Sequence, residues 1–347
     1  MDKKKIKIFL GAYINNINAQ NINCKSIATH LDKDRFNVYT MKLSGYNNDL
    51  IDGVRIFNCL KPYRISIPLA MIRGLLKCDI AYFPKHLDTP NWILKFANFL
   101  RKPVFTTIEI TLCDRSKTNL IDNFGGLTQL KNHFDLIPNI YGISQFITDN
   151  AKCGVHLNQK ILSLGVESKL YESKVKNKLT NIVFVGSLIK RKNVSQIIDL
   201  GAKFPDLNFH VIGDGNLLNT LKQGATENIK FYGKLNPLEL SEVLQSMDIL
   251  LLPSRSEGFP KVILEAAASG IPSIVYSDYG ASEWINNGEN GFIVNEFKEV
   301  IEVVNRLLDE GNLLQSCSSE VVYLADEFSW KNKIKVWEEE INNILNA

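Results

Sequence analysis

The sequence lacks the patterns that identify several common classes of protein. Its six cysteines form no CxxC pair and have no histidine at ligand spacing, so neither a zinc site nor a disulfide framework is indicated, and reduced thiols are expected. No apolar run approaches the roughly 20 residues that cross a bilayer. Neither half opens with a GxGxxG motif, which disfavours a dinucleotide-dependent dehydrogenase. The lysine-rich start leads into a short apolar segment containing Lys7, which we interpret as a strand and not as a signal peptide.

Charge is divided unevenly along the chain, although the net charge is only +3. Residues 1–170 carry 23 Lys and Arg against 13 Asp and Glu, whereas residues 171–347 carry 17 against 24. A basic first half suggests an anionic ligand or surface, such as nucleic acid or an acidic membrane leaflet. With 347 residues, 45% of them hydrophobic, the chain is long enough for two globular domains.

Short apolar runs alternate with segments of helical character over the whole chain. This βαβ organisation predicts α/β domains with parallel sheets, whose ligands bind beyond the carboxyl ends of the strands. We expect a first domain at 1–166, a charged linker at 167–180, a second domain at 181–327 and a closing helix at 328–347. The expected strands cover 5–12, 36–43, 53–58, 79–83, 103–108, 140–144, 160–164, 182–185, 208–212, 229–232, 248–252, 273–276 and 291–294, and the clearest helices 19–31, 67–77, 91–101 and 261–269.

The segment that begins at Glu257 combines a tight turn with the start of a helix. Gly258 lets a ligand approach the backbone, and Pro260 suits the first helical turn, where its missing N–H costs nothing. A helix N-terminus offers unpaired N–H groups and a partial positive charge to an anion such as phosphate. Glu257 and Glu265 flank the turn, which suggests a ligand with both hydroxyls and phosphate. The alternative is that Glu257 is only a turn residue and that Glu265 pairs with Lys261 on a solvated face of the helix.

The turn that follows the first strand of the second domain has the sequence GSLIKRKN and starts at Gly186. It places three cations between a strand and a helix, which is an arrangement that suits a diphosphate. An ordinary solvated turn is the alternative for this motif taken by itself.

The sequence EGFPKVILE, with Glu257 and Glu265 eight residues apart and AAASGIP after them, resembles the signature of retaining glycosyltransferases of family 4. These enzymes have the GT-B fold, in which two Rossmann-like doubly wound domains face each other across a cleft and a last helix crosses back to the first domain. The resemblance extends over nearly the whole chain and is strongest at 181–294.

The resemblance implies a role for each residue that matches the family's motifs. Glu257 would be catalytic, binding hydroxyls of the donor sugar and steadying developing positive charge, while Glu265 would bind the ribose and Lys192 the diphosphate. The other donor-binding residues implied are Gly11, Gly186, Lys234, Leu235, Gly258, Phe259 and Pro260.

The chain departs from the family pattern at several positions. Ser187 stands where an arginine usually follows the glycine, and asparagines follow Gly11 where a second glycine is usual. Glu109 stands where a histidine usually follows the strand, so we predict a catalytic role for Glu109 beside the reacting sugar, with a structural glutamate as the alternative. His86 is a second candidate, although a lone histidine is more often structural.

The reaction implied is transfer of a sugar from a nucleotide diphosphate sugar to a hydroxyl of a glycan or lipid-linked glycan, with retention, as in bacterial surface polysaccharide synthesis. We expect hexosyltransferase activity, a UDP-sugar in preference to a GDP-sugar, and no further cofactor. Asp32 and Asp34 form a DxD pattern, but they fall where turns favour aspartate, so no metal is predicted. The alternatives are a sugar-nucleotide epimerase of GT-B architecture and a non-catalytic sugar-nucleotide binding module.

Two basic and aromatic stretches of the first domain, at 61–77 and 92–102, predict peripheral contact with an anionic membrane. The alternative is a pair of helices with one core face and solvated lysines on the other. We expect a cytoplasmic protein that works at the inner face of the plasma membrane, with no nucleic-acid partner.

Overall fold

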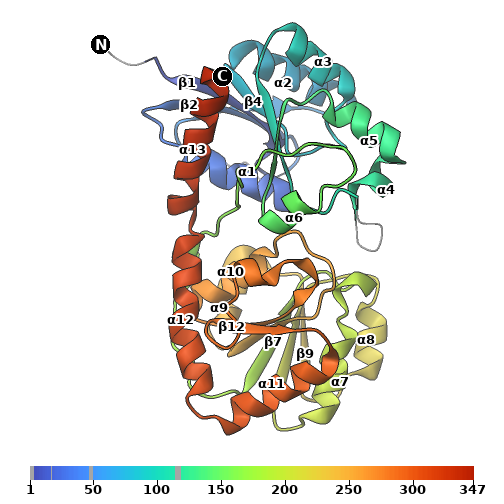
Figure 1. Cartoon of the computed structure of the whole chain (residues 1–347), viewed down its shortest axis with the longest axis vertical. Coiled ribbons are helices and arrows are strands. Elements are labelled where there is room, and N and C mark those ends of the chain that lie inside the picture. The colour runs from blue at the N-terminus through green and yellow to red at the C-terminus, as the bar shows by residue number, and fades with distance from the viewer. Residues whose placement is uncertain (1–3, 17, 47–49, 114–118) are drawn as a thin grey trace. The chain divides into compact units, whose positions relative to one another are not determined.

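The computed structural model describes residues 4–16, 18–46, 50–113 and 119–347. The chain divides into two compact units (Figure 1). Unit 1 comprises Met1–Gly165 together with Trp330–Ala347, and unit 2 comprises Val166–Ser329. The chain therefore leaves unit 1 after residue 165 and returns to it at residue 330.

Unit 1 is built on a six-stranded parallel sheet with the order β3-β2-β1-β4-β5-β6. Its strands are β1 (Ile6–Tyr13), β2 (Phe36–Leu43), β3 (Val54–Cys59), β4 (Ile80–Tyr82), β5 (Val104–Ile108) and β6 (Asn139–Gly142). Its helices are α1 (Ala19–His30), α2 (Tyr63–Lys77), α3 (Asn91–Phe99), α4 (Leu120–Phe124), α5 (Leu127–Phe134), α6 (Gln145–Asp149) and α13 (Trp330–Asn346). Burial of β1, β4 and β5 on both faces explains why these central strands consist mainly of uncharged, largely apolar residues, whereas the edge strand β3 is mostly not buried.

The last helix, α13, is part of the core of unit 1, where it packs beside α1 (Figure 1). The Trp337 ring lies edge-on to the Tyr82 ring, with 5.2 Å between centroids, and its indole Nε1 donates a hydrogen bond of 3.0 Å to the Ser163 carbonyl. The carboxylate of the next residue, Glu338, accepts a hydrogen bond of 2.7 Å from Arg35. Trp330, Ile334, Trp337 and Ile341 are buried and recur at helical spacing, so they form the face of α13 that packs in this core.

Unit 2 repeats the architecture, with the strand order β12-β11-β10-β7-β8-β9. Its strands are β7 (Asn181–Val185), β8 (Asn208–Ile212), β9 (Ile229–Gly233), β10 (Ile249–Leu252), β11 (Ser273–Tyr276) and β12 (Gly291–Val294). Its α-helices are α7 (Ser195–Lys203), α8 (Leu218–Gly224), α9 (Pro237–Leu244), α10 (Lys261–Ala268), α11 (Phe297–Asp309) and α12 (Leu313–Glu327). The strand order reverses between β7 and β10, which is where an open parallel sheet offers a crevice to a ligand.

The strand expected at 160–164 is wrong. Next to β6 the chain makes a single bridge, between Asn158 and Tyr141, which lies just before this segment. Within the segment the Leu162 amide donates to the Gly142 carbonyl at 3.1 Å, which is too little for a ladder. Residues 167–180, expected as a linker, are part of unit 2, where Lys176 is buried and donates from its ammonium to the Gln245 carbonyl at 2.8 Å.

The expectation that all cysteines are reduced is wrong for one pair. Cys113 and Cys153 form a disulfide, with their Cα atoms 5.8 Å apart. These two cysteines are 40 residues apart in sequence, so their spacing gave no sign of the pairing. The other cysteines, Cys24, Cys59, Cys78 and Cys317, are free and buried.

Among the described residues, no helix is both long and apolar enough to cross a membrane.

Candidate functional site

The candidate site of unit 2 lies at the carboxyl ends of β7 and β10, the two central strands between which the strand order reverses. The loop after β7 runs from Gly186 to Val194 and contains the three predicted cations. The loop after β10 runs from Pro253 to Pro260 and leads into α10. Parallel neighbours end at the same edge of a sheet, so the fold brings together two motifs about 65 residues apart, as the ion pairs below show.

Two cations of the first loop contact the carboxylate of Glu257 in the second. The Lys192 ammonium lies 2.5 Å from Oε1 of Glu257, and the Arg191 guanidinium lies 3.3 Å from the same atom. Arg191 also donates a hydrogen bond to the Ser256 carbonyl. The Lys192 and Glu257 side chains are only 12% and 9% exposed, so this pair is largely shielded from water.

Burial lowers the pKa of Lys192, and the neighbouring Arg191 adds to that effect, while the Glu257 carboxylate opposes it. A lysine in such surroundings keeps its charge because of its anionic partner. The arrangement therefore places a positive charge at the carboxyl ends of β7 and β10, and the Glu257 carboxylate holds it in position.

The glycines of neighbouring strand ends hold their loops against one another. The Gly186 amide donates to the Ile212 carbonyl at 3.0 Å, and the Gly213 amide donates to the Gly233 carbonyl at 2.8 Å. Gly213 has φ +137°, and a Cβ atom there would lie 1.9 Å from the Gly186 carbonyl oxygen. The Gly186 amide already donates its hydrogen bond to Ile212. A contribution of Gly186 to binding of the sugar donor would therefore consist of leaving space for that ligand.

The start of α10 presents backbone donors beside the ion pair. Helix α10 begins at Lys261, so Pro260 is its N-cap and lies one residue outside the helical turn in which we expected it. In the described part of the chain, the amides of Gly258 and Phe259 donate no hydrogen bond. The Phe259 ring points away into the core, 4.7 Å from the Trp284 ring and 5.3 Å from the Phe328 ring, which fixes the backbone of the turn.

Glu265 interacts both with Lys261, the neighbour on its own helix, and with Tyr171. The Tyr171 hydroxyl makes a side-chain hydrogen bond with Glu265, and Lys261 also acts on its charge. Burial raises the pKa of Glu265, and both neighbours oppose that rise. Lys234 and Leu235 lie further along the edge of the sheet, in the loop between β9 and α9, where Lys234 is exposed.

Glu109 of unit 1 follows β5, as expected, and Asn23 of α1 donates to its Oε1 at 3.4 Å. Burial raises the pKa of the Cys24 thiol, and the Glu109 charge adds to that rise. Gly11 lies within β1, two residues before its end, and not in a loop. A Cβ atom at Gly11 would lie 2.3 Å from a ring carbon of Phe83, so glycine here is required for packing.

His86 is buried in the core of unit 1. Its Nε2 donates to the Thr107 carbonyl at 3.1 Å, and its ring lies 6.0 Å from that of His133. Burial lowers the pKa of His86 to about 3, and His133 contributes to that fall. The sequence did not single out His133 or Lys85, whose ammonium lies 4.5 Å above the Tyr13 ring at the end of β1. No local motif accompanies either residue.

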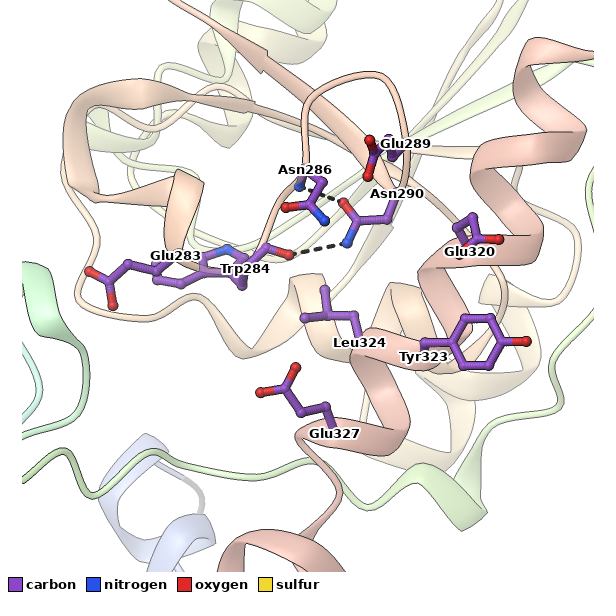
Figure 2. Close-up of a pocket in the computed structure, with 9 residues that line it drawn as sticks. All are labelled: Glu283, Trp284, Asn286, Glu289, Asn290, Glu320, Tyr323, Leu324 and Glu327. Carbon is purple, nitrogen blue, oxygen red and sulfur yellow. Dashed lines mark hydrogen bonds between the residues drawn. The ribbon is translucent and has the colours of Figure 1, made fainter.

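Unit 2 also contains a pocket of about 250 Å³ that includes none of the predicted site residues. Figure 2 shows Asn290 bridging the Asn286 amide, at 2.8 Å, and the Trp284 carbonyl, at 3.2 Å, with side chains of α12 opposite. Its lining includes the four carboxylates of Glu283, Glu289, Glu320 and Glu327. Their negative charge makes this pocket unsuited to a diphosphate, in contrast to the cationic edge at β7 and β10.

Asp32 and Asp34 lie in the turn before β2, as expected, where the Asp32 carboxylate accepts a hydrogen bond of 2.8 Å from the Asp34 amide. No group of three or more His, Cys, Asp or Glu side chains that could hold a metal ion occurs among the described residues.

Comparison with known proteins finds similarity to glycosyltransferases, mainly in unit 2. Residues 167–321 match the family described as glycosyl transferases group 1. An uncharacterized glycosyltransferase of Methanocaldococcus jannaschii, MJ1178, is 29% identical over 167 residues, which are 45% of this chain and 47% of that protein. The UDP-Gal:alpha-D-GlcNAc-diphosphoundecaprenol alpha-1,3-galactosyltransferase of Escherichia coli is 31% identical over 127 residues, 34% of this chain and 33% of its own length. The chain thus matches half or less of the length of these relatives.

The solved structures extend the likeness to the whole fold. Anabaena HepE, crystallised with UDP and glucose, superposes with a TM-score of 0.77 and 17% identity, covering 97% of this chain and all of that one. Together with the two doubly wound units, this likeness shows that the chain has the GT-B fold.

Proposed function

We propose that the protein is a retaining glycosyltransferase of family 4 that transfers a hexose from a nucleotide diphosphate sugar to a hydroxyl of a glycan or lipid-linked glycan. The observation that carries the proposal is the largely buried contact of Lys192 with Glu257 at the reversal of strand order in unit 2. Both residues lie within the segment that matches the glycosyl transferases group 1 family.

The proposed donor site uses the groups already gathered at this edge. Lys192 and Arg191 would bind the diphosphate, together with the amides of Gly258 and Phe259 at the start of α10. Glu257 would then exchange part of its contact with the two cations for hydroxyls of the donor sugar, and Glu265 would bind the ribose hydroxyls. The cations are positioned before the donor arrives, which reduces the reorganisation that binding requires.

In the proposed mechanism, the negative charge that develops on the departing diphosphate is stabilised by Lys192, Arg191 and the α10 amides. Attack from the face that the diphosphate leaves would retain the anomeric configuration, and the leaving phosphate would accept the proton of the attacking hydroxyl. Glu257 would steady positive charge on the sugar. This scheme requires neither a protein nucleophile nor a metal ion.

The names of two similar proteins support the donor and acceptor classes that we propose. The Escherichia coli relative is named for a UDP-sugar donor and a diphosphoundecaprenol-linked acceptor, and HepE was crystallised with UDP. We therefore propose a UDP-sugar donor and an acceptor from bacterial surface polysaccharide synthesis. Glu109, which follows β5, and Asn23 of α1, which donates to it, are proposed to orient the acceptor hydroxyl.

Substitution of the buried ion pair tests the proposal. Lys192→Ala should weaken binding of UDP by about 10 to 100-fold in isothermal titration, because a charge-assisted contact is lost. Glu257→Ala should abolish sugar transfer while UDP still binds. A matched control is the exposed pair Lys298–Glu302 on α11, whose atoms lie 3.5 Å apart and whose substitution by alanine should leave both readings unchanged.

The same assay separates the alternatives. Full transfer activity in Glu257→Ala would contradict the site, and activity that is lost in EDTA and restored by manganese would contradict the metal-free scheme. Incubation with donor alone would yield an epimer if the protein were an epimerase. Donor binding without turnover on any lipid-linked or free glycan acceptor would favour a binding module.

A further inference from the structure

Helix α2 exposes a stripe of large apolar side chains. Ile65, Leu69 and Leu76 are 60%, 51% and 59% exposed, and their spacing of four and seven residues places them on one side of the helix. The opposite side, including Met71 and Leu75, is buried against the sheet. A helix that has already buried one apolar face therefore presents a second one to solvent.

Helix α3 shows the same property. Trp92 and Phe99 are 50% and 81% exposed and are seven residues apart, so they lie on one side, while Ile93, Leu94 and Ala97 are buried. Leu60 and Leu87, in the loops beside the two helices, are 58% and 60% exposed. This region thus holds almost half of the large hydrophobic side chains that are exposed in the described part of the chain.

The two stripes belong to the same helical layer. The connections β3–α2–β4 and β4–α3–β5 run in the same direction across the sheet, so right-handed crossovers place both helices on one face. Helices α2 and α3 contact each other and lie side by side in Figure 1. We call the exposed side of these helices the α2–α3 face.

Exposed cations border the apolar stripes on both helices. Arg64, Arg73 and Lys77 on α2 and Lys95 on α3 are exposed, and neither helix contains an Asp or Glu. None of these four cations forms an ion pair within the described residues. Unpaired cations around exposed apolar side chains match a surface that is negatively charged outside and apolar beneath.

We propose that the α2–α3 face docks onto the surface of an anionic lipid bilayer. The apolar side chains would enter the boundary between headgroups and acyl chains, and the cations would remain at the level of the phosphates. An aromatic residue at each end of α3 suits this boundary, where amphipathic helices lie in the plane of the membrane. This docking is independent of the reaction proposed above and concerns unit 1 alone.

Sedimentation with vesicles tests the docking. The full chain should bind vesicles of phosphatidylglycerol and phosphatidylethanolamine, and high salt should weaken this binding. Its partition coefficient on vesicles of pure phosphatidylcholine should be at least about tenfold lower. Leu69→Ser with Phe99→Ser should lower the partition coefficient on the anionic vesicles by about tenfold or more, because two exposed apolar side chains that would enter the membrane are lost. Tyr323→Ser on α12 is the matched control, since Tyr323 is 69% exposed but lies in unit 2.

The outcomes distinguish a membrane from a protein partner. An unchanged melting temperature in the double variant is expected, because both side chains are exposed, and it assigns the lost binding to the surface. Absence of vesicle binding by the full chain, or equal binding by the double variant, would overturn the proposal. A dimer in sedimentation velocity that the double variant abolishes would also overturn it, by assigning the face to a second copy of the chain.

Discussion

The buried pair His86 and His133 should make unit 1 sensitive to acid. The nitrogens that face away from their hydrogen-bond partners, Nδ1 of His86 and Nε2 of His133, are buried and have no partner among the described residues. Protonation would place an N–H group and a charge among the rings of Phe124 and Phe134. Burial accordingly lowers the pKa of His86 to about 3 and that of His133 to about 4.

These shifts set the direction and size of the effect. The pKa values lie below the ordinary value of 6.5, so between about pH 4 and 6.5 the unfolded chain binds protons that the folded chain does not. Stability is therefore complete above pH 6.5 and falls as the pH is lowered. At about pH 5, which is about 1.5 units below the unfolded pKa, each histidine should cost about 2 kcal/mol and the pair about 4 kcal/mol.

Urea unfolding followed by tryptophan fluorescence at about pH 7.5 and pH 5 measures this loss. His86→Gln should remove about half of the dependence on pH, since the glutamine amide can still donate to the Thr107 carbonyl. His156→Gln is the control, because His156 is exposed in the same unit and should leave the dependence unchanged. A difference below about 1 kcal/mol between the two pH values for the unmodified protein would refute this reasoning.

Two further substitutions test the packing that supports the sites. Gly213→Ala should lower the free energy of unfolding of unit 2 by more than about 3 kcal/mol, since a Cβ atom would meet the Gly186 carbonyl oxygen and φ is +137°. Gly311→Ala is the control, because no atom lies within 4 Å of the added carbon. Equal melting temperatures for the two variants would contradict the contact at Gly213. Trp337→Ala should destabilise unit 1 by about 3 to 5 kcal/mol, because the ring is 1% exposed. Trp92 is half exposed, so Trp92→Ala should lower the free energy of unfolding by less than about 1 kcal/mol in the same denaturation experiment. A similar loss of stability in both tryptophan variants would count against a core role for α13.

The sequence predicted the fold class because buried parallel strands are short apolar runs separated by helices, and that signal is local. The strands 36–43, 208–212, 273–276 and 291–294 were predicted to the residue. The strand expected at 160–164 failed because its apolar residues pack as a loop beside β6, which periodicity does not distinguish from a ladder.

The sequence predicted which motifs contribute to the candidate site, but it did not predict which of their side chains contact one another. The motifs at Gly186 and Glu257 were visible, but the ion pair of Lys192 with Glu257 depends on two strands becoming neighbours in the sheet. The same limit applies to the disulfide of Cys113 with Cys153 and to the pair of His86 with His133, whose members are far apart in sequence. Charge and residue type predicted which residues were chemically able to act, whereas pairing required the topology.

The return of the chain to unit 1 at α13 makes unit 2 an insertion within the sequence of unit 1. The ends of the insertion are adjacent, because the Val166 amide donates to the Phe328 carbonyl at 2.9 Å and Val166 bridges to Ser329. Cleavage at both crossing points would therefore release unit 2 as one continuous fragment, whereas unit 1 would consist of two fragments. Helix α13 would then be held only by non-covalent contacts such as those of Trp337, as a peptide bound to the rest of unit 1.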